Sequence, residues 1–303
     1  SSTRDELRHY LDVAARLKRQ LHDTGRNDPL LSGKTLAMIF EKPLLRTRVS
    51  FAAATAHLGG TPIVLTGDEV GLDKREPVQD VARVLSGMCD GIMARVFEHS
   101  KILGLAKHAT VPVINGLSDY SHPCQALSDM LTIREHFGRL EGLTLAYIGD
   151  GNNVARSLSV ACGKFGMKFI IACPGGYELP SDDMDRIMTQ VPEMDFQMTH
   201  DARDAVRRAD VLYTDTWVSM GQEQEKQRRI KDFAGFCIDE SLLGAAPSHA
   251  IVLHCLPAYR GLEISERVFE SKQSLVFPQA HNRLHLQKGI MALPLARGRQ
   301  YGG

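Results

Sequence analysis

The chain lacks an excess of charge of either sign, and it lacks long apolar runs. Its 36 lysines and arginines balance 36 aspartates and glutamates, so the formal net charge is zero. No overall field therefore attracts nucleic acid or an acidic membrane surface, and an anionic ligand must be bound by a local cluster of cations. The longest apolar runs, such as 143–148 and 250–253, are far shorter than the ~20 residues that a membrane-spanning helix needs. The sequence therefore predicts neither a nucleic-acid partner nor a membrane span.

Cysteine pairs with metal-binding spacing are also missing. The six cysteines form no C-x-x-C motif, and most of them stand inside apolar runs, as buried reduced thiols do. This pattern disfavours a disulfide scaffold and a zinc site. The first 18 residues are charged and amphipathic, unlike the apolar core of a secretory signal. These features predict a reducing compartment, either the cytoplasm or the inside of an organelle.

Short β-branched runs alternate with helical patterns through most of the 303 residues. Such alternation is typical of parallel βαβ units, and the length favours two domains. We expect an α/β protein with two doubly wound parallel-sheet domains and an active-site cleft between them. A break at 138–142 separates a domain at 1–138 from a domain at 139–280, and the last segment, 281–303, is expected to pack back onto the first domain as a helix. The predicted strands are 35–40, 61–66, 91–96, 112–117, 143–148, 168–173, 195–199, 211–214 and 250–254.

The first predicted strand leads directly into a helix start that is rich in hydrogen-bond donors. Arg46, Thr47 and Arg48 follow the strand 35–40 and open that helix. A helix N-terminus presents unpaired backbone N–H groups and a partial positive charge, so this segment favours a phosphate. Read alone, it is equally compatible with two surface arginines on a first helical turn.

Two further strand ends in the first half carry groups of the same kind. Arg95 closes an apolar strand, where a buried cation needs an anion or a carbonyl oxygen as partner. His122 and Gln125 follow the strand 112–117, and their side chains can hydrogen-bond a carbonyl group. Each residue alone has an ordinary structural interpretation. Ligands in parallel α/β sheets bind beyond the carboxyl ends of the strands, so the coincidence at three strand ends indicates a binding site.

The second half opens with the turn GDGNN at 149–153, which superficially matches a dinucleotide fingerprint. The match fails because Val154 takes the place of the third glycine, and the strand 168–173 ends without the acidic residue that binds a ribose. We therefore expect no nicotinamide cofactor. Asn153 instead offers an amide at the edge of the sheet.

Two later strand ends add a carboxylate and a thiol. Asp215 follows the strand 211–214 and can bind an amine, although a helix-capping aspartate is an equally good interpretation. Cys255 follows the strand 250–254. A buried cysteine is usually inert, and its position at the same edge of the sheet makes it a candidate contact.

With these segments in place, the chain resembles the aspartate/ornithine carbamoyltransferase family over nearly its whole length. The ordered set is far more specific than any single motif, and the aspartate branch carries a different signature at 219–221 and 254–257. The matching segments are FEK at 40–42, RTR at 46–48, ARV at 94–96, HPCQ at 122–125, GDGNN at 149–153, Asp215 with SMG at 219–221, HCLP at 254–257 and NRLH at 282–285.

The resemblance implies transfer of a carbamoyl group from carbamoyl phosphate to the side-chain amine of L-ornithine, which yields L-citrulline and phosphate. It also implies no metal and no cofactor, a homotrimer or a higher multiple of trimers, and a cytoplasmic location, or the mitochondrial matrix in a eukaryote. The implied catalytic residues are Arg95, His122, Asp215 and Cys255. The implied ligands of carbamoyl phosphate are Leu44, Leu45, Arg46, Thr47, Arg95, His122, Gln125, Cys255, Leu256 and Arg283. Those of ornithine are Asn153, Asp215, Ser219 and Met220.

The chain departs from the pattern of the family at three places, which comprise four residues. Leu44 and Leu45 stand where its phosphate-binding turn has serine and threonine, Ala52 replaces a glutamate, and Gly71 replaces a glutamine or histidine that reaches the neighbouring subunit's phosphate. We expect weak binding of carbamoyl phosphate, because a hydrogen bond to a charged group contributes about 1.5–3 kcal/mol. The alternatives are a non-catalytic member of the family and an enzyme that acts on another amine, such as putrescine or an acylated ornithine.

Overall fold

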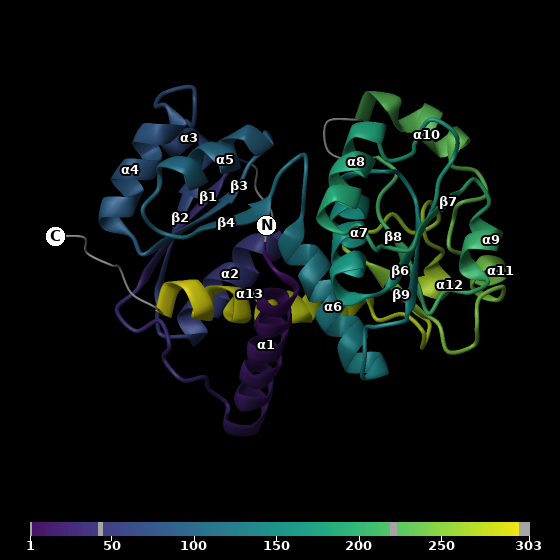
Figure 1. The fold of residues 1–303 in the computed structure, drawn as a ribbon, viewed down its shortest axis with the longest axis horizontal. Coiled ribbons are helices and arrows are strands. Elements are labelled where there is room, and N and C mark those ends of the chain that lie inside the picture. The colour runs from purple at the N-terminus through teal and green to yellow at the C-terminus, as the bar shows by residue number, and fades with distance from the viewer. Residues whose placement is uncertain (1, 42–44, 219–222, 297–303) are drawn as a thin grey trace. The chain divides into compact units, whose positions relative to one another are not determined.

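The computed structural model of the protein describes residues 2–41, 45–218 and 223–296. The chain forms two compact units, one made of residues 1–128 with 282–303 and the other of residues 129–281 (Figure 1). We call them unit 1 and unit 2. The sequence places a boundary at 138, behind the helix α6 (Pro123–Phe137), whereas the units divide inside this helix. A loop signal marks the end of an element, and it carries no information about where along a helix the packing partners change.

Unit 1 is built on a parallel sheet of four strands in the order β2-β1-β3-β4. The second part of the helix α13 (Val276–Ala296) belongs to this unit together with the start of α6. Its other elements are α1 (Arg4–Thr24), β1 (Thr35–Phe40), α2 (Leu45–His57), β2 (Thr61–Thr66), α3 (Gly67–Val70), α4 (Val78–Met88), β3 (Gly91–Arg95), α5 (His99–His108) and β4 (Val113–Leu117).

The apolar faces of these elements close a core around the two central strands. Leu36 and Met38 of β1 lie fully buried in one cluster with Met291 and Leu295 of α13, so the end of the chain completes this core. Gly289 lets α13 approach α1 closely, because a Cβ atom there would lie 2.6 Å from the carbonyl oxygen of Tyr10. The core of unit 1 therefore depends on α13, which follows all the other elements of this unit in the sequence.

Unit 2 contains a parallel sheet of five strands in the order β7-β6-β5-β8-β9. The predicted α/β class with two parallel sheets is thus confirmed. The elements of this unit beyond α6 and the start of α13 are β5 (Thr144–Ile148), α7 (Asn153–Phe165), β6 (Lys168–Ala172), α8 (Ser181–Gln190), β7 (Phe196–Thr199), α9 (Ala202–Val206), β8 (Val211–Thr214), the 3-10 helix η1 (Glu223–Glu225), α10 (Lys226–Asp232), α11 (Glu240–Leu243), β9 (Ile251–His254) and α12 (Glu266–Phe269).

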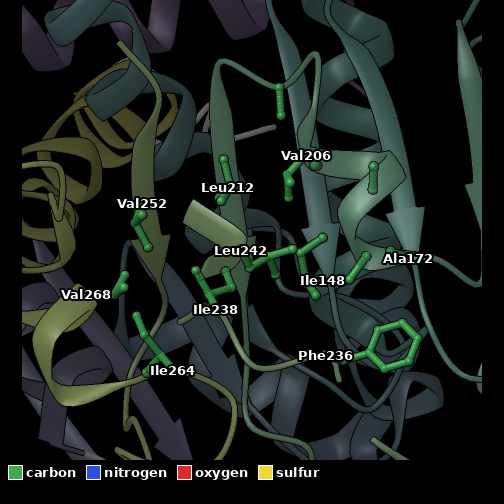
Figure 2. Close-up of a cluster of buried hydrophobic side chains, with 14 of the residues drawn as sticks. Ile148, Ala172, Val206, Leu212, Phe236, Ile238, Leu242, Val252, Ile264 and Val268 are labelled. Carbon is green, nitrogen blue, oxygen red and sulfur yellow. The ribbon is translucent and has the colours of Figure 1, made fainter. Parts of the chain in front are cut away.

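The core of unit 2 packs strand residues against the later helices and loops. Figure 2 shows Ile238 and Leu242 among the strand residues Ile148, Leu212 and Val252, all of them buried. The three strands β5, β8 and β9 are buried at every position. Near-continuous burial is expected for strands of a parallel sheet that is covered on both faces. Because β5, β8 and β9 pair in parallel, their carboxyl ends lie at the same edge of the sheet.

The described part of the chain contains no helix with both the length and the apolarity needed to cross a membrane. All six cysteines are free thiols, and four of them are buried: Cys89, Cys124, Cys162 and Cys173.

Candidate active site

The first cluster of predicted site residues lies at the carboxyl ends of β1 and β3 in unit 1. Thr47 stands in the first turn of α2 and is fully buried, and Arg95 is the last residue of β3. An Nη1–H of Arg95 donates to the hydroxyl of Thr47 at 2.6 Å. The Nη2 of Arg283, from α13, lies 3.5 Å from the same hydroxyl oxygen. One threonine therefore holds two arginines that come from distant parts of the sequence.

The start of α6 adds two more groups to this cluster. His122 directly precedes this helix, and both His122 and Gln125 are buried. The Oε1 of Gln125 accepts a hydrogen bond from Nη1 of Arg283 at 2.6 Å. The cluster therefore joins α2, β3, α6 and α13, as expected for a site at the carboxyl edge of a parallel sheet.

The charges in this cluster favour an anion. Burial, together with the positive charges of Arg283, Arg95 and Arg46, holds the pKa of His122 well below its usual range. His122 is therefore neutral near pH 7, when one ring nitrogen can still donate a hydrogen bond. Three arginines around a neutral histidine, beside the N-termini of α2 and α6, make an arrangement that can bind an anion and donate hydrogen bonds to it.

A buried ion pair that the sequence does not reveal supports the same edge of the sheet. Glu41 follows β1, and its carboxylate accepts from Nζ of Lys101 at 2.7 Å and from the backbone N–H of Phe97 at 2.7 Å. The side chains of Lys101 and Glu41 are only 8% and 11% exposed. This pair ties the segment after β1 to the segment after β3, and the backbone N–H of Glu41 also donates to the carbonyl oxygen of Arg95 at 3.0 Å. Glu41 belongs to a matching segment of the family, but no pattern in the sequence indicates Lys101 as its partner.

The second cluster lies in unit 2 at the ends of β5, β8 and β9. The Oδ1 of Asp215 accepts from Sγ of Cys255 at 3.1 Å and from the backbone N–H of Thr216 at 2.8 Å. The Oδ2 of Asp215 accepts from Nδ2 of Asn152 at 3.0 Å. Asn153, the predicted ornithine ligand, is the first residue of α7 and is partly exposed. The structure thus brings Asp215 and Cys255 together, as the sequence predicts.

Cys255 serves in this cluster as a donor. Burial, together with the negative charge of Asp215, raises the pKa of the Cys255 thiol well above its usual value. The sulfur therefore keeps its proton near pH 7 and gives a hydrogen bond to the carboxylate. A protonated thiol cannot take a proton from an amine, so only the carboxylate of the pair is a proton acceptor.

One group in the described residues has the donor set of a metal site, namely Asp215, His254 and Cys255. Both ring nitrogens of His254 already have partners, because Nδ1 accepts from the backbone N–H of Leu256 and Nε2 pairs with the carboxylate of Glu263. A neutral histidine has one lone pair to offer, and Leu256 uses it. The residues therefore form a hydrogen-bonded cluster that does not suit a metal ion.

The run of charges at 222–232 predicts a solvated helix or loop when the sequence is read alone. The structure shows that this stretch includes a buried anchor. Arg229 of α10 is buried and donates to Oδ2 of Asp150 at 2.6 Å, to the carboxylate of Glu225 at 2.8 Å and to the carbonyl oxygen of Trp217 at 3.0 Å. Asp150 belongs to the turn after β5, and Trp217 follows β8. The sequence-based interpretation is therefore wrong for Arg229, because a run of charges does not show which member has a buried partner.

The described residues include most of the predicted ligands, and two of these need comment. Leu45 is 74% exposed at the start of α2, and Leu256 has a left-handed backbone with φ of 60°. Leu44, Ser219 and Met220 lie outside the described residues.

Gly71, the third departure from the family pattern, is required by its own turn. It ends α3 with φ of 61°, a left-handed conformation, and a Cβ atom there would lie 2.6 Å from Cβ of Arg75. A glutamine or histidine at this position would be strained. The exposed Lys74 and Arg75 continue the turn. The departure is thus a change of the local backbone as well as of the side chain.

The observations above define a class of α/β proteins with two units, each of which has a parallel sheet and a polar cluster at the carboxyl ends of its strands. Two family models match the chain, namely the carbamoyl-P binding domain of aspartate/ornithine carbamoyltransferases at residues 1–135 and their Asp/Orn binding domain at residues 141–293. The chain belongs to the aspartate/ornithine carbamoyltransferase family.

Individual relatives match over nearly the full chain. An ornithine carbamoyltransferase of Thermococcus kodakarensis is 48% identical over 293 residues, which cover 96% of this chain and 93% of that relative. A chloroplastic ornithine carbamoyltransferase of Pisum sativum is 46% identical, over 95% of this chain and 76% of that relative. The solved structure of the Pyrococcus furiosus ornithine carbamoyltransferase has a TM-score of 0.93 and 47% identity, and covers 97% of this chain and 94% of the solved one.

Proposed function

We propose that this protein transfers the carbamoyl group of carbamoyl phosphate to the side-chain amine of L-ornithine, which yields L-citrulline and phosphate. The observation that carries the proposal is the cluster of Arg46, Arg95 and Arg283 around a neutral His122 in unit 1. This arrangement suits a phosphate that carries a carbonyl group. The names of the relatives from Thermococcus kodakarensis and Pisum sativum, both ornithine carbamoyltransferases, support the same substrates.

In this proposal, unit 1 binds carbamoyl phosphate. Arg46, Thr47 and Arg95 bind the phosphate, because they stand at the N-terminus of α2 and at the end of β3 beside it. His122, Gln125 and Arg283 surround the carbamoyl group. The hydrogen bond from Arg283 to Gln125 fixes the orientation of both side chains before substrate binds.

Ornithine is bound by unit 2 in the same proposal. Its side-chain amine resembles that of lysine, whose pKa is about 10.4, so it must lose a proton to become a nucleophile near neutral pH. The carboxylate of Asp215 is the acceptor at this point, and Cys255 donates to that carboxylate to hold it in place. Asn153, Ser219 and Met220 are assigned to the rest of the amino acid.

The reaction itself is an acyl transfer. The amine nitrogen forms a bond to the carbonyl carbon, the bond from that carbon to the phosphate oxygen breaks, and the amine releases its proton. Negative charge develops on the carbonyl oxygen, and Arg95, His122 and Thr47 are fixed donors for it. A fixed donor of this kind lowers the barrier by about 2–4 kcal/mol. The leaving phosphate is already bound by the cluster of arginines when its bond to the carbon breaks.

The proposal places the protein in arginine metabolism, in the cytoplasm or, in a eukaryote, in the mitochondrial matrix. It also includes a homotrimer. Exposed apolar side chains among the described residues concentrate in unit 1, which favours that unit as the contact with further copies of the chain. In unit 1 these side chains are Leu45, Val49, Ile63, Val84, Met88, Phe97 and Leu103, and in unit 2 they are Met188, Met198, Tyr259 and Phe277.

An assay of amine specificity tests the proposal. The purified protein is incubated with carbamoyl phosphate and separately with ornithine, putrescine, N-acetylornithine and aspartate, and the carbamoylated products are measured over a wide range of carbamoyl phosphate concentrations. We expect citrulline alone, with saturation only at high carbamoyl phosphate. A product from another amine instead of ornithine contradicts the assigned substrate. No product from any amine, from a folded protein that binds an ornithine analogue, contradicts the assignment as an enzyme.

A further inference from the structure

Asn152 links the backbone of the turn after β5 to the carboxylate that faces the amine. It directly precedes α7 and caps this helix, because its Oδ1 accepts from the backbone N–H groups of Val154 at 2.9 Å and Ala155 at 3.0 Å. Its Nδ2 donates to Oδ2 of Asp215 at 3.0 Å. The Oδ1 atom of this amide therefore caps α7, while its Nδ2 group binds the carboxylate of Asp215.

The orientation of this amide is set by its surroundings. The hydroxyl of Tyr147 also donates to Oδ1 of Asn152, at 3.3 Å. Burial, together with the negative charges of Asp215 and Asp150, raises the pKa of Tyr147 well above its usual value, so this hydroxyl keeps its proton. Three donors meet Oδ1, so a flipped amide would set its NH₂ group against all of them. The NH₂ group must face Asp215.

We propose that Asn152 is a positioning residue, which holds the carboxylate of Asp215 in the orientation needed to accept a hydrogen bond from the ornithine amine. This inference rests on the proposed function and adds a residue to it. Oδ1 of Asp215 is held by Thr216 and Cys255, and Oδ2 is held by Asn152. Without the amide, Oδ2 loses the donor that comes from the end of β5.

Two substitutions separate positioning from capping. Aspartate caps a helix as well as asparagine does, so Asn152→Asp keeps α7 intact while it replaces the donor by a second carboxyl group. Serine also caps, so Asn152→Ser keeps an acceptor and removes the donor. Asp201→Asn is the matched control, because Asp201 caps α9 in the same way, through the backbone N–H groups of Arg203 and Asp204.

The pH dependence of Asn152→Asp gives a signature that a structural role would not produce. The titratable groups that face Asp215 are Tyr147, Asp150, Tyr213, His254 and Cys255, and burial keeps the protons on both tyrosines and on the thiol. The introduced carboxyl group therefore adds a like charge beside Asp215. Two carboxyl groups at about 3 Å share one proton as the pH falls, and the shared proton restores a donor between them.

Steady-state kinetics of the full-length protein test the proposal. At pH near 8 we expect kcat/KM for ornithine to fall about 10- to 100-fold in Asn152→Asp and about 10-fold in Asn152→Ser. We expect the KM for carbamoyl phosphate, the melting temperature and the kinetics of Asp201→Asn to stay near their original values. The difference in kcat/KM for ornithine between Asn152→Asp and the unmodified protein should become smaller as the pH falls towards about 6.

Three results would overturn the assignment. Unchanged kcat/KM for ornithine in both variants would leave Asn152 with a capping role alone. Equal losses for both substrates together with a lower melting temperature would indicate general damage to the fold. Absence of citrulline from the unmodified protein would refute the proposed function and this inference together, whereas activity in the unmodified protein with unaffected variants refutes the inference alone.

Discussion

Leu45 places an exposed apolar side chain at the start of α2, beside the buried Thr47. Backbone N–H groups at this helix start remain available to a phosphate, whereas a leucine offers no hydroxyl. We expect the combined change Leu44→Ser and Leu45→Thr to lower the KM for carbamoyl phosphate about 10- to 100-fold, because each hydrogen bond to a charged phosphate adds about 1.5–3 kcal/mol. Initial rates at saturating ornithine measure this effect.

Leu103→Ser controls for the loss of exposed apolar surface, since Leu103 is 60% exposed on α5 of the same unit. An unchanged KM for carbamoyl phosphate in the double variant would show that the two leucines do not limit binding.

His122 predicts a pH dependence of stability. Its pKa in the folded protein lies well below 6.5, chiefly because of burial, whereas the unfolded chain titrates near 6.5. Below about pH 6.5 the unfolded chain therefore binds a proton that the folded protein excludes, and the free energy of unfolding falls by up to about 1.4 kcal/mol per pH unit. Above that pH the contribution is complete. Urea unfolding between pH 5 and 7 measures this effect. The free energy of unfolding should depend less steeply on pH in His122→Asn than in the unmodified protein.

The matched control for this measurement is His22→Asn, because the side chain of His22 is 88% exposed in unit 1. An equal slope in His122→Asn and in the unmodified protein would contradict the neutral, buried state of His122.

Among the elements, α10 shows how one helix can contain both a structural and a solvated arginine. Arg229 is buried against Asp150, whereas the side chain of Arg228, its neighbour, is 78% exposed and pairs with Asp232 at 3.4 Å. Removal of one partner from a buried ion pair costs about 3–5 kcal/mol because the other charge stays buried. We expect Arg229→Met to lower the free energy of unfolding by about that amount, and Arg228→Met to change it by less than about 0.5 kcal/mol. Chemical denaturation measures both values, and equal effects would contradict the assignment of Arg229 as the anchor.

The elements themselves were largely predictable from the sequence. Short apolar and β-branched runs place β1 and β2 at 35–40 and 61–66, where the structure has them. The main difference between the expected and the observed elements is the start of α13. The sequence pattern predicts a start at 281, whereas the helix begins at Val276. Pro278 obscures that start in the sequence, although a proline is tolerated in a first helical turn where its missing N–H has no partner.

The site was predictable only in part. Residues at strand ends, such as Arg95 and Asp215, follow from the rule that parallel strands deliver ligands at their carboxyl ends. Residues that act through a long-range partner, such as Lys101 with Glu41 and Arg229 with Asp150, have no signal in the local sequence. Their partners are determined by the strand order of each sheet, which a single sequence does not state.

At the scale of the whole molecule, the exposed apolar residues of unit 1 predict self-association. Val84 and Met88 lie one turn apart on α4 and are 50% and 73% exposed. We expect light scattering to give about three times the chain mass of 33.5 kDa, and the combined change Val84→Glu and Met88→Glu to reduce it, because charge is costly in an apolar interface. Met198→Glu, in unit 2, is the control. A monomeric unmodified protein would contradict the trimer.

Unit 1 is interrupted in the sequence, and this affects how the chain folds as it is made. Its core needs Met291 and Leu295 against Leu36 and Met38, so residues from both ends of the chain must be present before that core can close. Unit 2 is continuous from 129 to 281 and is fully synthesised earlier. Domains that fold during translation usually do so in N-terminal order. Here the order is reversed. Synthesis starts with unit 1, but unit 2 is the first that can finish folding. The core of unit 1 stays incomplete until α13 has been synthesised.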